Sequence, residues 1–295
     1  MPVRCIVGRG CVEQSGGIFA SAGKRCLIVT GRSSARLSGA LGDAEKALQG
    51  AGISYDIFDG IGANPLVSAC CAAGKRARDI GAEFILGIGG GSVLASKAIA
   101  IYAADPSLAP MDIYKREYSG TPLPVLLIGT TAGTGSEVTG VAVLTNDETG
   151  AKKSISGADC YAAVSFCDYG YTRTMPRKET VSTALDAFAH AVEGFFTPKC
   201  GGVLDLYAKK CIPQIYDGLR ELAEGGEIDD SLRERLYEGS IYAGLVINTC
   251  GTAFPHPLGY VLTENYRIPH GMACAAFFGA FIDRCERFAP EKAAE

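Results

Sequence analysis

Short apolar runs alternate with helical stretches through the first 130 residues, and this alternation restricts the possible folds most. The apolar runs are residues 26–30, 53–58, 84–88 and 124–129, and helical stretches are expected at 39–50 and 92–104. Asn64-Pro65 predicts a further helix start, with Asn64 as the N-cap and Pro65 at the first helical position. Short apolar strands between helices indicate an α/β fold whose parallel sheet is covered on both faces.

The pattern changes near residue 176. Strand-like runs disappear, and long helical stretches follow at residues 180–196, 204–224 and 231–248. A chain of 295 residues is long enough for two domains. We therefore predict an α/β domain over residues 1–172 and an all-helical domain over residues 173–295.

The charge pattern disfavours several classes of partner. The net charge is −4 and no basic run occurs, so we expect binding neither to nucleic acid nor to an anionic membrane. The longest uncharged stretch, residues 239–263, is interrupted by Asn248, Pro255 and Pro257, and we interpret it as protein interior. Residues 1–17 contain no apolar signal core, and the twelve cysteines are scattered without any C-x-x-C pair. Reduced thiols and a cytoplasmic location are the simplest expectation.

Two glycine-rich turns follow consecutive strands. The first, Gly89-Gly90-Gly91-Ser92, opens a helix, where backbone N–H groups can hold a phosphate. Glycines also serve ordinary tight turns, so this signal alone is weak. The second turn, residues 130–136, is rich in threonine and glycine and follows the next strand. Two such turns at neighbouring strand ends can face each other across one crevice, which predicts a dinucleotide or phosphate site.

The end of the first apolar run, residues 26–30, indicates whether the chain would prefer NAD or NADP. It is followed by Gly31-Arg32-Ser33-Ser34, with no carboxylate for a ribose 2′-hydroxyl. One cation and two hydroxyls suit a 2′-phosphate instead, so NADP is favoured over NAD. The alternative is a helix-capping turn with an exposed arginine.

The three histidines of the chain all lie in its helical half. Asp186 and His190 are four residues apart, on one face of a helix that is apolar on most sides. His256 lies between two prolines, and His270 follows 14 residues later in Pro269-His270-Gly271. A backbone carbonyl could satisfy each imidazole. Three neutral imidazoles and one carboxylate could instead bind Fe²⁺ or Zn²⁺, and spacing alone leaves both possibilities open.

Together these motifs resemble the iron-containing (group III) alcohol dehydrogenase family, with residues 30–34 closest to its NADP-using, butanol and propanediol dehydrogenase-like branch. The resemblance rests on five motifs. They are the first glycine-rich turn, the run T-T-A-G-T-G-S-E-V-T over residues 130–139, the Asp186/His190 helix, His256, and Pro269-His270-Gly271. The resemblance implies a Rossmann-like N-terminal domain and a helical C-terminal domain, as in dehydroquinate synthase-like proteins. It places the active site in the cleft between them.

The resemblance also implies an enzyme, a metal-dependent oxidoreductase that transfers hydride between a primary alcohol or aldehyde and NAD(P). The family's metal-ligand positions, for Fe²⁺ or Zn²⁺, fall on Asp186, His190, His256 and His270. The cofactor-binding positions fall on Gly31, Arg32, Ser33, Ser34, Gly89, Gly90, Gly91, Ser92, Thr130, Thr131, Thr134, Ser136 and Lys152, or its neighbour Lys153.

Three features depart from the family pattern. The helix after the first turn lacks the family's Asp after Leu94. Tyr260 occupies a position where many members have a further His; as a proton relay its phenol starts from a pKa of about 10. The chain stops at Glu295, several helices short of the usual length: either the sequence is incomplete, or the helical domain is pared down and its exposed side is covered by a partner chain, as in a homodimer.

Two other hypotheses remain open at this point. One is a catalytically weak or silent relative that binds metal and nucleotide without turnover, because it lacks the Asp after Leu94 and has a short C-terminus. The other is a lyase of the related dehydroquinate synthase-like group, against which the run at residues 130–139 argues.

Overall fold

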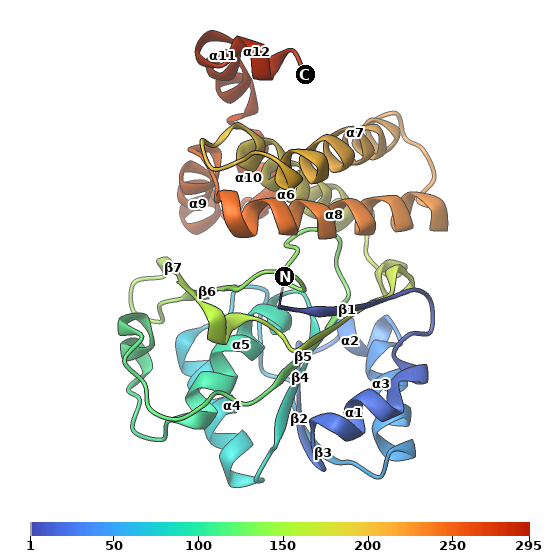
Figure 1. Cartoon of the computed structure of the whole chain (residues 1–295), viewed down its shortest axis with the longest axis vertical. Helices are drawn as coiled ribbons and strands as arrows, with labels where there is room; N and C mark the ends of the chain where they lie inside the picture. Colours follow the sequence, from blue (N-terminus) through green and yellow to red (C-terminus); the bar gives the residue numbers. More distant parts are fainter. Residues whose placement is uncertain (1) are drawn as a thin grey trace. The chain divides into compact units, whose positions relative to one another are not determined.

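The computed structural model describes residues 2–295, which form two compact units (Figure 1). The first, here called the sheet unit, runs up to Thr130 and continues over Ser136–Thr174. The second, the helical unit, comprises Met175–Glu295 together with the short segment Thr131–Gly135. The second glycine-rich turn is therefore divided between the two units.

The sheet unit contains a six-stranded, entirely parallel sheet. In spatial order its strands are β1 (Arg4–Val7), β8 (Val164–Cys167), β5 (Val125–Gly129), β4 (Phe84–Gly89), β2 (Arg25–Thr30) and β3 (Ser54–Phe58). In the register, Thr30 pairs with Ile88, and Gly89 pairs with Gly129. The carboxyl ends of β2, β4 and β5 therefore lie side by side, and the two glycine-rich turns begin at neighbouring strand ends.

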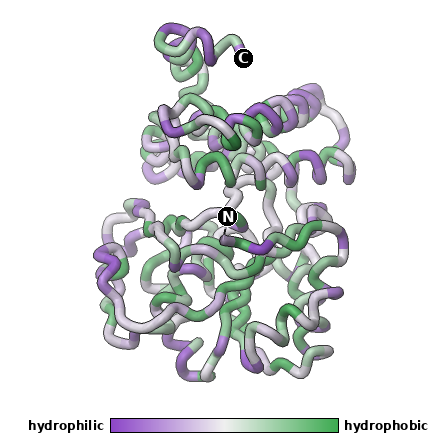
Figure 2. The backbone as a smooth tube through the Cα atoms, in the orientation of Figure 1, coloured by the Kyte–Doolittle hydropathy of each residue, from purple (hydrophilic) through white to green (hydrophobic). Residues whose placement is uncertain are grey.

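Helices cover both faces of this sheet (Figure 1). One face packs against α4 (Val67–Asp79) and α5 (Gly91–Ala104), and the other against α1 (Gly16–Ala22) and α3 (Ala40–Gly50). Alternate strand residues enter the two cores, so β2 buries side chains on both sides. This explains why the central strands are continuously hydrophobic (Figure 2) and could be recognised as apolar runs.

Several small elements of the sheet unit were not expected. They are α2 (Ser34–Leu37), the antiparallel hairpin of β6 (Val141–Thr145) and β7 (Lys152–Ser156), and short 3₁₀ helices at Glu13–Ser15, Pro110–Lys115, Ala158–Cys160 and Tyr169–Thr172. Strands β1 and β8 were also missed, because each has four residues. The β7 sequence KKSIS is largely polar, and its strand is stabilised by pairing with β6.

The predicted helix start at Asn64-Pro65 is wrong. Helix α4 begins at Val67, and its N-cap is Leu66 in an extended conformation. The Thr145 backbone N–H donates to the Pro65 carbonyl at 2.7 Å, and Leu66 forms a parallel bridge with Thr145. This pairing with β6 keeps the chain extended at Pro65 and Leu66, so the helix starts two residues after the proline.

The helical unit consists of α6 (Arg177–Phe196), α7 (Val203–Ala223), α8 (Asp230–Cys250), α9 (Pro255–Tyr266), α10 (His270–Ala275), α11 (Phe278–Phe288) and α12 (Pro290–Ala293). Helix α6 is central, because it contacts α7, α8 and α10. Its buried residues include both Asp186 and His190. Over residues 2–295, no helix has the length and apolar character needed to cross a membrane.

Candidate active site

Four ligand-type side chains meet in the helical unit. Helix α6 supplies Asp186 and His190, α9 supplies His256, and α10 supplies His270. The Nε2 atoms of His190 and His256 each lie 3.7 Å from Asp186 Oδ1, and Nε2 of His270 lies 3.8 Å from the same oxygen. One carboxylate oxygen is thus surrounded by three imidazole nitrogens.

Local sequence features explain how α10 reaches this cluster. His270 is the first residue of α10, and Gly271 follows it directly against α6. A Cβ atom on Gly271 would lie 1.8 Å from the Ser182 carbonyl oxygen and 2.6 Å from the Asp186 backbone nitrogen. Only glycine allows this approach of the two backbones, so Gly271 determines how close His270 comes to Asp186.

The imidazole rings of the cluster pack on one another and on Tyr260. The rings of His190 and His256 stack with centroids 4.7 Å apart, and the Tyr260 ring stacks on His270 at 4.9 Å. Asp186, His190 and His256 are buried, whereas the His270 side chain is 24% exposed. The cluster is therefore enclosed except on the side of His270.

The cluster has the properties of a cation site. Among residues 2–295, neither Asp186 Oδ1 nor His256 Nε2 has a hydrogen-bond partner, although both atoms are buried. Such atoms are costly to bury unless something else binds them. Ligand atoms at about 2.0–2.2 Å from a tetrahedral Zn²⁺-type ion lie roughly 3.3–3.5 Å apart. The observed spacings are slightly longer, and the donor set of three nitrogens and one anionic oxygen suits Fe²⁺ or Zn²⁺.

The pKa values of the cluster reflect burial and mutual charge. Burial lowers the pKa of His190 to about 4, against the attraction of Asp186. For His256, burial acts in the same direction, but the carboxylates of Asp186 and Glu193 raise its pKa to about 9. Burial opposes ionisation of Asp186 as well, yet the imidazoles, His190 foremost, hold its pKa well below the usual range. In the metal-free cluster a proton held by His256 thus offsets the charge of Asp186, and a divalent cation would take the place of that proton.

Two further side chains at the cluster were missed by sequence reasoning. Glu193, on α6, is completely buried and contacts His256 Nδ1 at 2.6 Å. Cys274 lies one turn after His270, with its Sγ 3.8 Å from Nε2 and 3.9 Å from Nδ1 of that ring. These nearly equal distances place the sulfur beside the ring and off the lone-pair axis of either nitrogen. A glutamate in an otherwise apolar helix segment, three residues after His190, was the available signal for Glu193.

Tyr260 adjoins the cluster at the position predicted for a proton relay. Burial, and then the charge of Asp186, raise its pKa to about 12. The phenol therefore keeps its proton at neutral pH. In this form it can donate a hydrogen bond and is a poor base.

The first glycine-rich turn lies at the end of β4. Gly89 has a φ of +140°, and a Cβ on Gly91 would lie 2.6 Å from the Gly62 carbonyl oxygen. The Thr130 backbone N–H donates to the Gly89 carbonyl at 3.2 Å, which joins the two turns. The buried Thr130 Oγ1 has no hydrogen-bond partner in the described part of the chain. This edge therefore offers backbone and hydroxyl groups at the N-terminus of α5, as a phosphate site requires.

The other predicted cofactor residues are distributed around the same unit or beyond it. Arg32, Ser33 and Ser34 are exposed after β2, the strand next to β4. Thr131 and Thr134 belong to the segment assigned to the helical unit, while Ser136 is buried in the sheet unit. Lys152 comes from the separate β6–β7 hairpin, and the ammonium group of its neighbour Lys153 lies 4.7 Å from the Tyr114 ring centroid.

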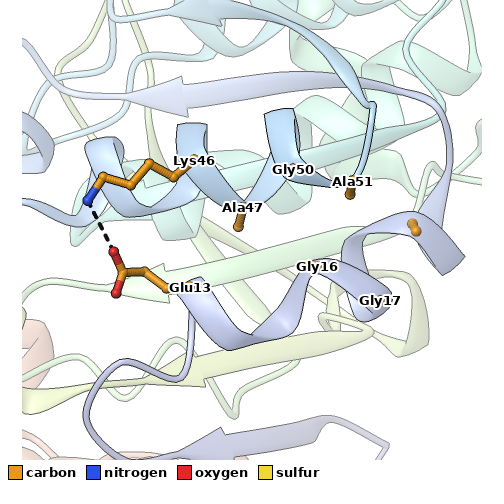
Figure 3. A pocket seen from close by; sticks show the side chains of 8 residues that line it. Glu13, Gly16, Gly17, Lys46, Ala47, Gly50 and Ala51 are labelled. Atoms are coloured by element: carbon orange, nitrogen blue, oxygen red, sulfur yellow. Dashed lines mark hydrogen bonds and ion pairs between the residues drawn. The ribbon is translucent and has the colours of Figure 1, made fainter.

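A separate hollow of about 490 Å³ lies between α1 and α3 in the sheet unit (Figure 3). Its lining is mostly glycine and alanine, and the Glu13–Lys46 ion pair, at 3.1 Å, lies on its rim. None of the candidate site residues lines this open hollow.

Comparison with known proteins covers both units. The family described as iron-containing alcohol dehydrogenase matches residues 2–169, and the C-terminal part of the Fe-containing alcohol dehydrogenase family matches residues 180–295. A probable alcohol dehydrogenase of Escherichia coli is 28% identical over 276 residues, which are 93% of this chain and 70% of that protein. The lactaldehyde reductase of E. coli is 30% identical over 257 residues, covering 85% of this chain and 66% of that protein.

Solved structures agree with these sequence matches. An iron-containing alcohol dehydrogenase of Thermotoga maritima superimposes with a TM-score of 0.92 at 36% identity, covering 99% of this chain and 80% of that one. A 1,3-propanediol oxidoreductase superimposes with a TM-score of 0.90 at 27% identity, covering 99% and 76%. A Rossmann-like domain followed by a helical domain is thus the architecture of this chain as well. With both halves matched in order, and a cluster of metal-ligand side chains in the second, the chain belongs to the iron-containing alcohol dehydrogenase family and is an oxidoreductase.

Proposed function

We propose that this oxidoreductase transfers hydride between a small primary alcohol or aldehyde and a nicotinamide dinucleotide at a metal held by Asp186, His190, His256 and His270. The observation that carries the proposal is the buried Asp186 Oδ1, which has three imidazole Nε2 atoms at 3.7–3.8 Å and, over residues 2–295, no hydrogen-bond partner. In this proposal, residues 1–172 bind the dinucleotide and residues 173–295 bind the metal.

The chain's own residues have distinct tasks at this site. A bound Fe²⁺ or Zn²⁺ would supply a Lewis acid that polarises the substrate oxygen and lowers the pKa of an alcohol. Asp186 supplies one negative charge, and the enclosed helices exclude water from the buried side of the cluster. His270, the partly exposed ligand, lies where substrate has access. Tyr260, stacked on it and protonated at neutral pH, is placed to pass a proton toward the substrate oxygen.

The dinucleotide is proposed to bind at the carboxyl ends of β2, β4 and β5. The N-terminus of α5 and the turn backbone suit its phosphates, and Thr130 Oγ1, which has no hydrogen-bond partner among residues 2–295, adds a hydroxyl. Exposed Arg32 and Ser33 after β2 support a preference for NADP, since they can bind a 2′-phosphate. Lys152 remains a proposed cofactor contact.

The substrate class follows the relatives, which include lactaldehyde reductase, 4-hydroxybutyrate dehydrogenase and 1,3-propanediol oxidoreductase. These names share a primary alcohol or aldehyde on a short carbon chain, and we extend that class to this chain. A homodimer and a cytoplasmic location also remain proposals.

Metal content tests the central proposal. Elemental analysis of protein purified without oxygen, from cells supplied with iron and zinc, should give about one metal per chain. Asp186→Asn keeps the size of the side chain and removes the anionic ligand, so it should lose most of the metal and the alcohol-dependent reduction of NADP. A wild-type protein without metal under these conditions would refute the metal site.

The cofactor preference has its own test. Arg32→Gln should lower the ratio of kcat/KM for NADP to kcat/KM for NAD by about tenfold, which corresponds to about 1.4 kcal/mol of binding free energy. Arg36→Gln is the matched control, because Arg36 is an exposed arginine of the adjacent helix α2. An unchanged ratio in the Arg32 variant would refute its contact with the 2′-phosphate.

The missing Asp after Leu94 separates this proposal from the silent relative. Leu94→Asp supplies a carboxylate at this turn without shifting the register of α5, whose residues from Ala95 onward are buried, and it should change turnover little. Activity that appears only in the Leu94→Asp variant would instead support the silent relative.

A further inference from the structure

Glu193 is a charged side chain that the proposed chemistry does not use. It lies on α6, one turn after His190, and it is 0% exposed. Its Oε1 lies 2.6 Å from His256 Nδ1, and its Oε2 accepts a hydrogen bond from the Ala253 backbone N–H at 2.7 Å. A buried carboxylate is thus held by the histidine and by the loop that leads into α9.

The two bonds restrict the chemistry of the group between them. An ionised carboxylate has only acceptors, so the short contact to His256 requires that Nδ1 carries the proton. The other ring nitrogen, Nε2, is the one that lies 3.7 Å from Asp186 Oδ1. With Nδ1 protonated in the neutral ring, Nε2 keeps its lone pair directed into the cluster.

We propose that Glu193 is a positioning residue for the metal centre, which fixes the tautomer and the ring orientation of His256 so that Nε2 is available as a ligand. This inference rests on the proposed metal site. The second hydrogen bond, from the Ala253 backbone N–H to Glu193 Oε2, restrains the carboxylate itself. Ala253 lies two residues before α9, the helix that carries His256, so the carboxylate is held against the start of that helix. In such a chain of carboxylate, histidine and metal, the carboxylate raises the basicity of the histidine that binds the metal and restrains the orientation of its ring.

A single amide substitution has a sharp consequence here. Glutamine is nearly isosteric with glutamate but has one oxygen and one NH₂ group. If its oxygen accepts from Ala253, its NH₂ group faces Nδ1 of His256, which must then be unprotonated. The ring proton moves to Nε2, where it blocks metal binding. If the amide is reversed, its NH₂ group faces the Ala253 N–H, and that donor loses its partner.

The experiment measures metal affinity without any assay of activity. The full chain is stripped of metal, and the dissociation constant for Zn²⁺ is measured by competition with a chelating dye. Glu193→Gln should raise this constant 10- to 100-fold. Glu179→Gln is the control, because it makes the same chemical change at an exposed position of the same helix, and its constant should stay within twofold of wild type.

A second measurement does not depend on the folding of any variant. Nitrogen NMR of ¹⁵N-histidine in the metal-free wild type reports which ring nitrogen carries the proton. We expect protonated Nδ1 in His256 at a pH where the ring is neutral. Protonated Nε2, or equal Zn²⁺ affinity in wild type and Glu193→Gln, would overturn the role of Glu193 and leave the metal site intact. Wild-type protein that binds no Zn²⁺ would overturn both.

Discussion

The two glycine-rich turns look alike in sequence, but different parts of the molecule hold them. In the first, Gly91 lies against the backbone at Gly62, inside the sheet unit. In the second, a Cβ on Gly135 would lie 2.5 Å from Gly244 Cα, and the segment around it belongs to the helical unit. A glycine-rich turn therefore marks a close backbone approach, and the approaching group is the loop at Gly62 in the first turn and helix α8 in the second.

The same contrast between close packing and open space occurs within each unit. In the helical unit, glycines occur where helices cross closely, as at Gly271 against Ser182 and at Gly239 against Ile215. In the sheet unit, several glycines, such as Gly17, lie in open space, where a methyl group on the Cα atom would have no other part of the described chain within 4 Å. Glycine is thus required by packing at some positions and merely tolerated at others, and substitutions by alanine distinguish the two cases.

The largest effect is expected at Gly271. Gly271→Ala would place a methyl group 1.8 Å from the Ser182 carbonyl oxygen, so α10 must move away from α6. We expect a loss of about 3 kcal/mol or more in stability, and loss of bound metal because His270 moves with the helix. Thermal unfolding and elemental analysis measure the two effects. Gly279→Ala on α11, where the described chain leaves open space, is the control and should keep the metal and lose no stability.

The next largest loss of stability is expected at Gly135, in the second glycine-rich turn. Gly135 has a φ of +57°, so Gly135→Ala combines about 1 kcal/mol of backbone strain with a clash against Gly244. We expect a total loss of about 2–4 kcal/mol by denaturant unfolding. Gly150→Ala has a similar φ of +70° and open space in the described structure, so it isolates the strain and should cost about 1 kcal/mol. Equal losses in the two variants would mean that Gly244 does not contact the turn.

Lys97 connects the segments that follow the two turns within the sheet unit. Its buried amine makes the stability of the fold depend on pH. It lies on α5, after the first turn, and its Nζ donates to the carbonyl oxygens of Thr139, at 2.6 Å, and Val141, at 2.9 Å, after the second turn. Burial lowers its pKa to about 8 in the folded chain, from 10.5. Between these values the unfolded chain binds more protons, so this group makes stability rise with pH over that window.

The prediction is tested as a difference between two proteins. Buried thiols such as Cys26, whose pKa burial raises, make stability fall over the same pH range. Lys97→Met lacks only the lysine contribution. The stability of wild type relative to this variant should therefore increase by on the order of 1–3 kcal/mol between pH 8 and 10.5, measured by urea unfolding. A constant difference across that range would contradict the lowered pKa.

The smallest effect is expected at Gly17 in α1. A methyl group there would meet no described atom within 4 Å, and its φ is not positive. Gly17→Ala should therefore stabilise the chain by about 0.5 kcal/mol, through the lower entropy of the unfolded state. A shift of the thermal midpoint upward would confirm that this glycine is tolerated. A clear downward shift would mean that the hollow beside it (Figure 3) is occupied by another group.

Much of the fold could be predicted because its central strands are buried on both faces. The apolar runs at residues 26–30, 84–88 and 124–129 correspond to β2, β4 and β5. Strand β7 and the start of α4 could not be predicted, since both depend on pairing with β6, a contact between distant segments.

The same distinction applies to the candidate site. Asp186 and His190 share a helix face, so their proximity follows from spacing. The approach of His256 and His270 was inferred from the family resemblance, because the sequence does not encode the crossing of α9 and α10 with α6 in any local pattern. The contact of Glu193 with His256 depends on the same crossing and was missed.

The pairing of β1 with β8 has a consequence for biosynthesis. Arg4 pairs with Val164, and β8 lies between β1 and β5 in the sheet. Strands β2 to β5 can therefore pair soon after each leaves the ribosome, while the apolar edge of β5 stays open until β8 is made. At roughly 5–20 residues per second, the first strand waits on the order of ten seconds or more for its partner. During that interval the unpaired N–H and C=O groups of β5 remain open to pairing with another chain.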